Sequence, residues 1–245
     1  EIAPYSGKLK DYFKDLNINK NNFFTDISNY ISYEMGQPTH CYDAKKIGDF
    51  SLEIIEEEKT FHTLLEKEIV LKGKNLVFLQ DGKVINLAGV MGDLNTSCST
   101  NTKSVIVECA HFNPEEIIGK SVKYDLKSDA AHKFERGTDP LCLEKTLRRF
   151  IKIVSDHANI INVEIYKDNF VDYFPTKIPF DIKKIGHILG IFNDKKAFEE
   201  YLLKLGFEIL DNKIIVPSYR NDIKNLNDIA EEIARVIGYN NIPAT

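Results

Sequence analysis

The chain has 245 residues, of which 43% are hydrophobic and 28% charged, and its formal net charge at pH 7 is −5. This composition is typical of a globular chain with one large domain or two smaller ones. The acidic balance argues against a protein that coats nucleic acid through a broad basic surface. Any RNA contact would use a local patch or a neighbouring part of an assembly. No apolar run approaches the roughly 20 residues of a membrane-spanning helix, so no membrane association is expected.

The cysteine pattern indicates a reducing environment. Cys41, Cys98, Cys109 and Cys142 are far apart and form no C-x-x-C pair. We therefore expect free thiols in a cytoplasmic protein, and neither a zinc site nor a disulfide framework. The N-terminus lacks a start methionine, a basic leader and a signal-peptide core, and we expect the chain to be cut from a longer protein.

The first part of the chain mixes helical and β patterns. Helical apolar spacing covers residues 9–16, and residues 23–31 suit a helix or a strand before a turn at 36–38. Short β-branched runs follow, separated by turn signals such as the hairpin dipeptide Asp81-Gly82. The predicted strands are residues 51–55, 68–71, 76–79, 83–87 and 104–110.

Two helices follow these strands. Asn113 is the expected cap of the first, with Pro114 in its first position and two acids in its first turn. The second covers residues 140–158, and its apolar stripe consists of Leu143, Leu147, Phe150, Ile151 and Val154. Residues 1–172 are therefore predicted to form an α+β domain with mixed or antiparallel sheets and helices.

A composition shift near residues 173–176, with Pro175 and Pro179, indicates a linker to a second domain, residues 173–245. Three predicted helices and one β segment resemble a small winged-helix-like arrangement. The helices are residues 181–189, 195–205 and 226–237, and the β segment is residues 207–216. Such folds often bind DNA, but acidic and basic residues nearly balance here. A free-standing DNA-binding module is therefore disfavoured.

Five stretches, taken in order along the chain, carry a resemblance to one protein family. They are residues 26–30 with 35–43 (DISNY and MGQPTHCYD), 87–92 (LAGVMG), 107–114 (VECAHFNP), 128–140 (SDAAHKFERGTDP), and 216–222 with 231–239 (VPSYRND and EEIARVIGY). In this order and spacing they resemble the beta subunit of bacterial-type phenylalanyl-tRNA synthetases, with its editing domain and the winged-helix-like domain that follows.

The resemblance implies proofreading. An apolar phenylalanine pocket rejects an added hydroxyl by only ~10²-fold, a limit known from aminoacyl-tRNA synthetases themselves, so a second site must hydrolyse the error. In the family this module hydrolyses tyrosine mischarged onto tRNA-Phe. The chain would be an aminoacyl-tRNA ester hydrolase with no aminoacylation activity alone. A structural scaffold of the synthetase heterotetramer, with weak or lost editing, is the alternative.

Two residues are assigned to catalysis by the resemblance. His40 matches the editing-site histidine, whose imidazole would position or activate water or hydrogen-bond the terminal ribose. Spacing alone favours a histidine satisfied by backbone in a turn, and the motif reverses this preference. Glu108 matches the glutamate that accepts a hydrogen bond from the tyrosine hydroxyl, since a carboxylate among apolar neighbours needs a donor. The Val-Glu alternation also allows a solvent-facing glutamate on an edge strand.

Six further residues match substrate-binding positions: Ser28, Asn29, Gly89, Gly92, Ser128 and Ala130. The glycines would let a ligand approach the backbone, although each also suits a tight turn. Ala130 would be a small wall residue, and the two serines stand where the family usually has threonine, which predicts a looser fit. Residues 19–22 and Asp93 depart from the family pattern, which predicts weaker editing.

Four acids in the second domain match a magnesium site that the family shares with the alpha subunit: Asp222, Asp228, Glu231 and Glu232. The last three lie on one helix face, and hard oxygen ligands suit magnesium. A solvated acidic face near a helix N-terminus would show the same pattern. Editing itself needs no cofactor. The expected partners are tRNA-Phe and the alpha subunit, in an alpha2beta2 heterotetramer.

Overall fold

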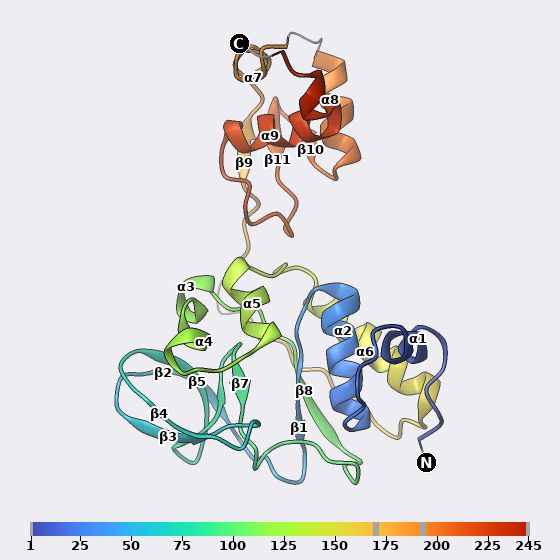
Figure 1. Ribbon diagram of the computed structural model, residues 1–245, viewed down its shortest axis with the longest axis vertical. Helices are drawn as coiled ribbons and strands as arrows, with labels where there is room; N and C mark the ends of the chain where they lie inside the picture. Colours follow the sequence, from blue (N-terminus) through green and yellow to red (C-terminus); the bar gives the residue numbers. More distant parts are fainter. Residues whose placement is uncertain (1, 169–171, 192–194, 244–245) are drawn as a thin grey trace. The chain divides into compact units, whose positions relative to one another are not determined.

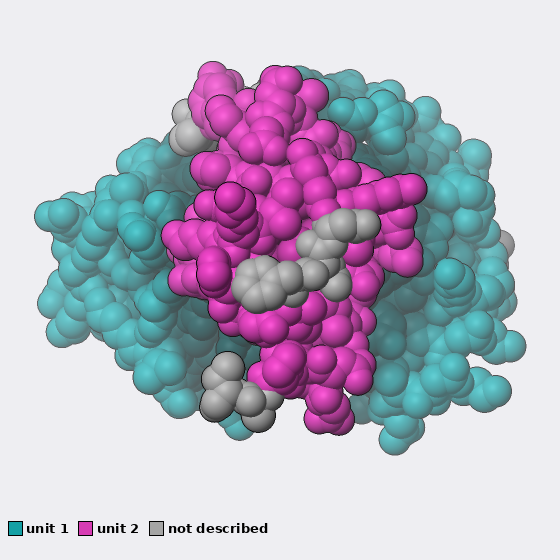
Figure 2. All heavy atoms as spheres, turned by 90° about the horizontal axis from the view of Figure 1, so that it is seen from above, with its two compact units in different colours: residues 1–166 teal, residues 167–245 magenta. Residues whose placement is uncertain are grey.

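A computed structural model of the chain describes residues 2–168, 172–191 and 195–243. These divide into two compact units, Glu1–Tyr166 and Lys167–Thr245, which Figure 2 shows in separate colours. The sequence placed the division between residues 172 and 173, next to residues 169–171, which lie outside the described part. Each unit has its own core and is described by itself.

Unit 1 has the predicted α+β fold, with short antiparallel strands in three sheets (Figure 1). One sheet has the order β2-β5-β6-β7, and β3-β4 and β1-β8 are two-stranded. The strands are β1 (His40–Asp43), β2 (Ser51–Ile55), β3 (Lys59–His62), β4 (Glu68–Leu71), β5 (Asn75–Gln80), β6 (Lys83–Leu87), β7 (Met91–Gly92) and β8 (Val105–Glu108). The five predicted strands are confirmed, with small changes at their ends, whereas β1, β3 and β7 were not predicted.

The hairpin between β5 and β6 follows from its turn dipeptide. Asp81 and Gly82 both have positive φ, 49° and 74°. Two successive positive φ angles define a type I′ turn, whose twist matches that of the flanking strands. Strand β7 then pairs antiparallel with β6, which places Gly92 opposite Asn86.

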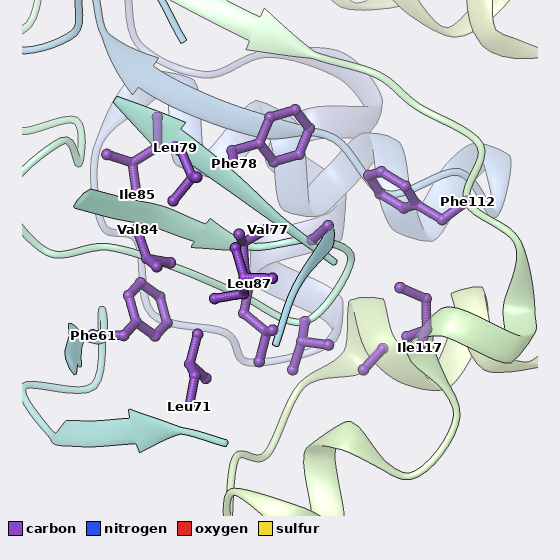
Figure 3. Packing of buried hydrophobic residues seen from close by; sticks show 14 of the residues in the cluster. Phe61, Leu71, Val77, Phe78, Leu79, Val84, Ile85, Leu87, Phe112 and Ile117 are labelled. Atoms are coloured by element: carbon purple, nitrogen blue, oxygen red, sulfur yellow. The ribbon is translucent and has the colours of Figure 1, made fainter. Parts of the chain in front are cut away.

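A first hydrophobic core lies between these small sheets and two short helices, α3 (Pro114–Ile117) and α5 (Asp129–Arg136). The helix between them, α4 (Lys120–Lys123), buries none of its residues. In Figure 3, Phe61 and Leu71 come from β3 and β4 toward Val84 and Leu87 of β6. Phe112, in the segment after β8, packs edge-on against a phenylalanine of α5 at a centroid distance of 5.0 Å. Burying each such side chain stabilises the fold by about 1.5–3 kcal/mol.

A second core lies among three longer helices, α1 (Gly7–Asp15), α2 (Phe23–Met35) and α6 (Leu143–His157). Residues 23–31, which suited a helix or a strand, are helical. Asn22 caps α2 by accepting a hydrogen bond from the Thr25 backbone N–H at 3.1 Å. The helix ends at Gly36, whose φ of 73° is the left-handed conformation favoured by glycine.

The buried face of α6 differs from the predicted stripe. The structure buries Thr146, Phe150, Ile153 and His157, so only Phe150 belongs to both sets. The His157 ring contacts the Ile153 carbonyl and accepts a hydrogen bond from the Ser6 backbone N–H at 3.1 Å. This face carries two polar residues, since His157 finds a partner in the N-terminal segment and Thr146 finds one in Cys142. An apolar pattern alone could therefore not locate it.

The β1–β8 ladder separates the two cores of unit 1. Its strands alternate, so that Cys41 and Val107 pack against the helical core and Tyr42 and Ile106 against the sheet core. The residue pair at the end of the ladder, His40 and Glu108, shares the face of Tyr42.

The described residues of unit 2 form three antiparallel strands in the order β10-β11-β9 and three α-helices. Its elements are β9 (Lys177–Pro179), α7 (Ile182–Leu189), α8 (Lys195–Lys204), β10 (Glu208–Leu210), β11 (Lys213–Ile215), α9 (Leu226–Ile237) and the 3-10 helix η1 (Tyr239–Asn241). The predicted helices are confirmed. Residues 177–179, predicted as linker, form an edge strand that ends at a proline, a position that proline tolerates. Among the described helices of both units, none is long and apolar enough to cross a membrane.

Candidate active site

His40 begins β1, directly opposite Glu108 of β8. Its ring packs edge-on against Tyr42, with ring centroids 4.4 Å apart. Gly92 lies against the same ring, because a Cβ added to Gly92 would be 2.6 Å from His40 Nε2. Nε2 is buried and has no hydrogen-bond partner in the part of the chain that the structure describes. His40 therefore lies on a strand, with one ring nitrogen unsatisfied, and is not a turn histidine held by backbone.

Burial sets the charge of this imidazole. Loss of solvation lowers the pKa of His40 to about 4, because an apolar environment disfavours the charged form. At neutral pH the ring is therefore neutral and has one donor and one acceptor nitrogen. An unpaired buried polar atom costs free energy, so a bound polar group would find a receptive partner here.

Glu108 has hydrogen-bond donors on only one of its two oxygens. The Tyr42 hydroxyl donates to Oε2 at 2.9 Å, and Asn86 Nδ2 donates to the same oxygen at 3.2 Å. Asn86 Nδ2 also donates to the Tyr42 hydroxyl oxygen at 2.8 Å. Within the described part of the chain, Oε1 accepts no hydrogen bond. Glu108 is thus half-buried against neutral partners, with one oxygen available.

Burial raises the pKa of Glu108 to about 7, although the hydrogen bond from Tyr42 acts in the opposite direction. Desolvation disfavours a carboxylate, and no cation among the described residues lowers its pKa in compensation. At neutral pH this carboxyl is therefore divided between its ionised and protonated forms. Such a group can accept a hydrogen bond from a ligand, and its accepting strength depends on pH.

The two predicted pocket glycines have different surroundings. A Cβ on Gly89 would lie 3.1–3.2 Å from side-chain atoms of Ile117, Phe134 and Phe112. With its φ of 68°, Gly89 turns the chain between β6 and β7 and makes room for the aromatic core. Gly92 instead makes room for the His40 ring. Ala130, on α5, is half-buried and packs against the same core as Gly89.

The polar substrate-binding candidates are partly engaged within the chain. Ser28, buried on α2, donates to the Thr39 carbonyl at 2.6 Å, next to His40. Ser128 caps α5 by accepting a hydrogen bond from the Ala131 N–H at 3.1 Å. Asn29 is exposed on α2. Contact of these three residues with a substrate stays a prediction.

Three residues at this site were missed by the sequence analysis: Gln37, Tyr42 and Asn86. Gln37 is buried, and its Nε2 donates to the Ala110 carbonyl at 2.8 Å, which ties the segment before β1 to the segment after β8. Tyr42 belongs to one of the matched stretches. The sequence signal that could have identified it is a hydroxyl-bearing side chain at a position that alternates with apolar residues. Asn86 lies 44 residues from Tyr42 in the chain, and no sequence signal pointed to it.

The departures from the family pattern have local structural partners. Asp93 is buried and accepts a hydrogen bond from the Asn95 backbone N–H at 2.8 Å. Asn22 caps α2 and also donates to the Cys98 carbonyl at 3.2 Å. These residues stabilise loops in unit 1, and their effect on editing stays a prediction.

The four acids predicted to bind magnesium are held by cationic and backbone groups of unit 2. Arg220 donates to Asp222 at 2.6 Å and to Glu232 at 2.8 Å. Asp228 accepts hydrogen bonds from two backbone N–H groups in the cap of α9, and Glu231 pairs with Arg235 at 3.0 Å. Among the described residues, no group of three or more His, Cys, Asp or Glu side chains is arranged to hold a metal ion. These acids do not fit a magnesium site formed by this chain alone.

Comparisons with known proteins match both units. The B3/4 domain matches residues 1–159, and the tRNA synthetase B5 domain matches residues 178–239. The phenylalanine–tRNA ligase beta subunit of Francisella tularensis is 32% identical over 233 residues, covering 91% of this chain and 30% of that protein. The corresponding subunit of Protochlamydia amoebophila is 35% identical over 230 residues, 91% of this chain and 29% of that protein.

Among solved structures, an N-terminal fragment of the phenylalanyl-tRNA synthetase beta subunit from Pyrococcus horikoshii aligns with a TM-score of 0.41 and 15% identity. That alignment covers 89% of this chain and 65% of the fragment. The chain spans about 30% of the length of the curated relatives described above.

Proposed function

Because the chain belongs to the B3/4 domain family and to the bacterial-type phenylalanyl-tRNA synthetase beta subunits, as its motifs predicted, we propose that unit 1 hydrolyses tyrosine mischarged onto tRNA-Phe. The observation that carries this proposal is the pairing of His40 with Glu108 across the end of the β1–β8 ladder. The pair combines a ring nitrogen without a partner and a carboxyl with one unused oxygen.

In this proposal Glu108 recognises the wrong amino acid, tyrosine. Its Oε1 accepts a hydrogen bond from the phenol of a tyrosyl ester, whereas a phenylalanyl ester leaves that oxygen unpaired. A hydrogen bond to a charged group contributes about 1.5–3 kcal/mol. Sites that read a substrate hydroxyl in this way discriminate far better than sites that must only exclude it. This asymmetry suits proofreading, because the aminoacylation pocket fails on the same hydroxyl.

In this proposal His40 positions the reacting groups. In the tautomer with its proton on Nδ1, Nε2 accepts a hydrogen bond from a water molecule or from a ribose hydroxyl. The low pKa of the ring makes it a weak base, so it orients the nucleophile and does not carry a full positive charge. Nε2 is buried beside Gly92, so Gly92 limits the space around this nitrogen.

The reaction is an ordinary ester hydrolysis. Water adds to the carbonyl carbon, and the bond between that carbon and the ribose oxygen breaks. The proton lost by water ends on the ribose hydroxyl, and tyrosine leaves with the new carboxyl group. These steps are proposed without a metal ion.

The test uses the whole synthetase carrying this chain and preformed Tyr-tRNA-Phe. His40→Ala should slow tyrosine release by about 10² or more, the usual contribution of a positioned acid–base group. Glu108→Ala should lower the rate for Tyr-tRNA-Phe relative to Phe-tRNA-Phe. His62→Ala is the matched control, since His62 is exposed on β3. Full activity in both site variants would defeat the assignment.

The remaining roles follow from the same family. We propose that the whole beta subunit belongs to a cytoplasmic phenylalanine–tRNA ligase, binds tRNA-Phe and assembles with the alpha subunit into a heterotetramer. Any magnesium bound near Asp222, Asp228, Glu231 and Glu232 would need ligands from that partner. Equal tyrosine release by the enzyme with and without unit 1 would leave a scaffold role in place of editing.

A further inference from the structure

Three buried or half-buried polar groups form a closed network at the candidate site. Tyr42 is fully buried, and Asn86 is 4% exposed. Asn86 donates to both the Tyr42 hydroxyl and Glu108 Oε2, and Tyr42 donates to the same Oε2. Since the Tyr42 oxygen already accepts from Asn86, its single proton is directed to Glu108. The direction of every hydrogen bond in the network is therefore determined.

The network treats the two carboxyl oxygens of Glu108 differently. Both donors meet at Oε2, on the side of the sheet core, and none of the described residues donates to Oε1. A glutamate side chain held in this way has lost most of its rotational freedom before any ligand binds. A ligand that binds to Oε1 therefore causes a smaller loss of side-chain conformational entropy, which is the usual advantage of a preorganised site.

We propose that Tyr42 and Asn86 are positioning residues for amino-acid discrimination: they occupy Glu108 Oε2 and leave Oε1 as the acceptor for the phenol of a tyrosyl ester. This inference rests on the proposed function and names the residues that orient its specificity group. The bond from Tyr42 is itself a phenol donating to this carboxylate, at 2.9 Å. Glu108 is thus chemically suited to the contact that the substrate would make.

The same donors affect the charge of Glu108. Hydrogen bonds to the ionised form favour it, whereas burial opposes it. The titratable groups that face or adjoin Glu108 are His40 and Tyr42 on β1 and Cys109, its neighbour in the chain, with Cys41 on the other face of β1. At neutral pH His40 is neutral, and none of these groups supplies a positive charge. Removing the Tyr42 donor therefore moves the carboxyl toward its protonated form, which is a poorer acceptor.

The decisive variant is Tyr42→Phe, which removes one oxygen and keeps the ring that packs against His40. In the whole enzyme at pH 7, the preference for Tyr-tRNA-Phe over Phe-tRNA-Phe should fall about fivefold, because raising the pKa of Glu108 by about one unit cuts its ionised fraction from a half to about a tenth. The preference should return as the pH is raised to 9. Asn86→Ala should change it in the same direction.

Tyr30→Phe is the matched control. Tyr30 also donates its hydroxyl to a glutamate, Glu34, at 2.8 Å, but it packs in the helical core, whereas Tyr42 packs in the sheet core. Its removal should leave both the preference and its pH dependence unchanged. An equal loss in the Tyr30 and Tyr42 variants would show a general effect on folding and overturn the inference.

A second measurement separates this inference from the proposed function. The carboxyl ¹³C shift of Glu108 in the 245-residue chain, followed against pH, should give a pKa near 7 that rises in Tyr42→Phe. If the wild-type enzyme edits but neither the pKa nor the preference changes in Tyr42→Phe, the inference fails alone. If the pKa rises but the wild-type enzyme releases no tyrosine, the proposed function fails and the inferred role in specificity fails with it.

Discussion

Glu108 in unit 1 and Glu232 in unit 2 are both withdrawn from water, but the groups around them differ. Glu232 is 3% exposed and accepts hydrogen bonds from both terminal nitrogens of Arg220, at 2.9 and 2.8 Å. Arg220 lowers the pKa of Glu232. Glu108 has a tyrosine and an asparagine as partners, and burial raises its pKa to about 7.

The difference separates a structural carboxylate from one suited to a ligand. A guanidinium binds both oxygens of its partner and keeps it ionised over the working pH range. Neutral donors leave Glu108 with an unused oxygen and a charge that changes near neutral pH. Strong perturbation of a carboxyl directly opposite a second perturbed group, His40, is typical of functional sites.

The largest effect should come from breaking the pair in unit 2. Arg220→Met leaves Glu232 buried without its main partner, and loss of one member of a buried pair destabilises a fold by about 3–5 kcal/mol. Urea unfolding of the 245-residue chain would measure this loss in unit 2. The transition of unit 1 should not move. A change of less than 1 kcal/mol would mean that the Arg220–Glu232 pair does not stabilise unit 2.

The second effect is the change of the free energy of unfolding with pH, which has opposite signs for Glu108 and His40. The pKa of Glu108 is higher in the folded chain than the ordinary glutamate value, so its contribution is present at low pH and is lost as pH rises toward about 7. The pKa of His40 is lower than the ordinary value, so its contribution grows as pH rises from about 4 to 6.5. Each contribution is about 3 kcal/mol, and in the wild type they nearly cancel.

Single variants should reveal these opposing slopes. Between pH 4.5 and 6.5, Glu108→Gln should gain stability relative to the wild type as pH rises, and His40→Asn should lose it. Denaturant midpoints at several pH values measure both changes. Parallel curves for the wild type and both variants would contradict the assigned pKa directions.

A smaller effect tests how His40 is held. Gly92→Ala places a methyl group within 2.3 Å of His40 Cε1, so the ring or the strand must shift. Overpacking of this kind costs about 1–3 kcal/mol. Tyrosine release should fall as well. Gly48→Ala is the control, because its nearest neighbour would be 4.0 Å away; equal behaviour of the two variants would remove Gly92 from the site.

The smallest effect is expected at the exposed pair of unit 2. Arg235 contacts Glu231 and Glu232, but its side chain is 56% exposed. Arg235→Met should change the stability of unit 2 by less than about 1 kcal/mol, because solvent screens exposed pairs. A loss as large as that of Arg220→Met would show that the arginines act as one network.

Local patterns predicted the elements well where a cap, turn or apolar face was present. Helix α9 was predicted at the residues it occupies, and the Asp81-Gly82 turn specified its hairpin. Strands β1, β3 and β7 have two to four residues each. Strand β1 pairs with β8, far along the chain, whereas β3 and β7 pair with their chain neighbours β4 and β6. No local propensity distinguishes such short strands from loops.

Only part of the site was predicted, because the rest depends on strand pairing and on burial. The motifs singled out His40 and Glu108, and their direct opposition across a ladder is a property of strand register, which a motif does not encode. The roles of Tyr42 and Asn86 depend on side chains that come together from β1 and β6. A hydroxyl and an amide attract notice in a sequence only once their burial is known.

The β1–β8 ladder joins residues that are distant in the chain, since His40 and Glu108 enclose all of β2 to β7 between them. Closing a loop of this length costs conformational entropy that the contacts within the loop must first offset. We therefore expect His40 and Glu108 to meet only after the small sheets have formed. Slow assembly of those sheets during refolding would delay the return of ester hydrolysis behind the recovery of helix content.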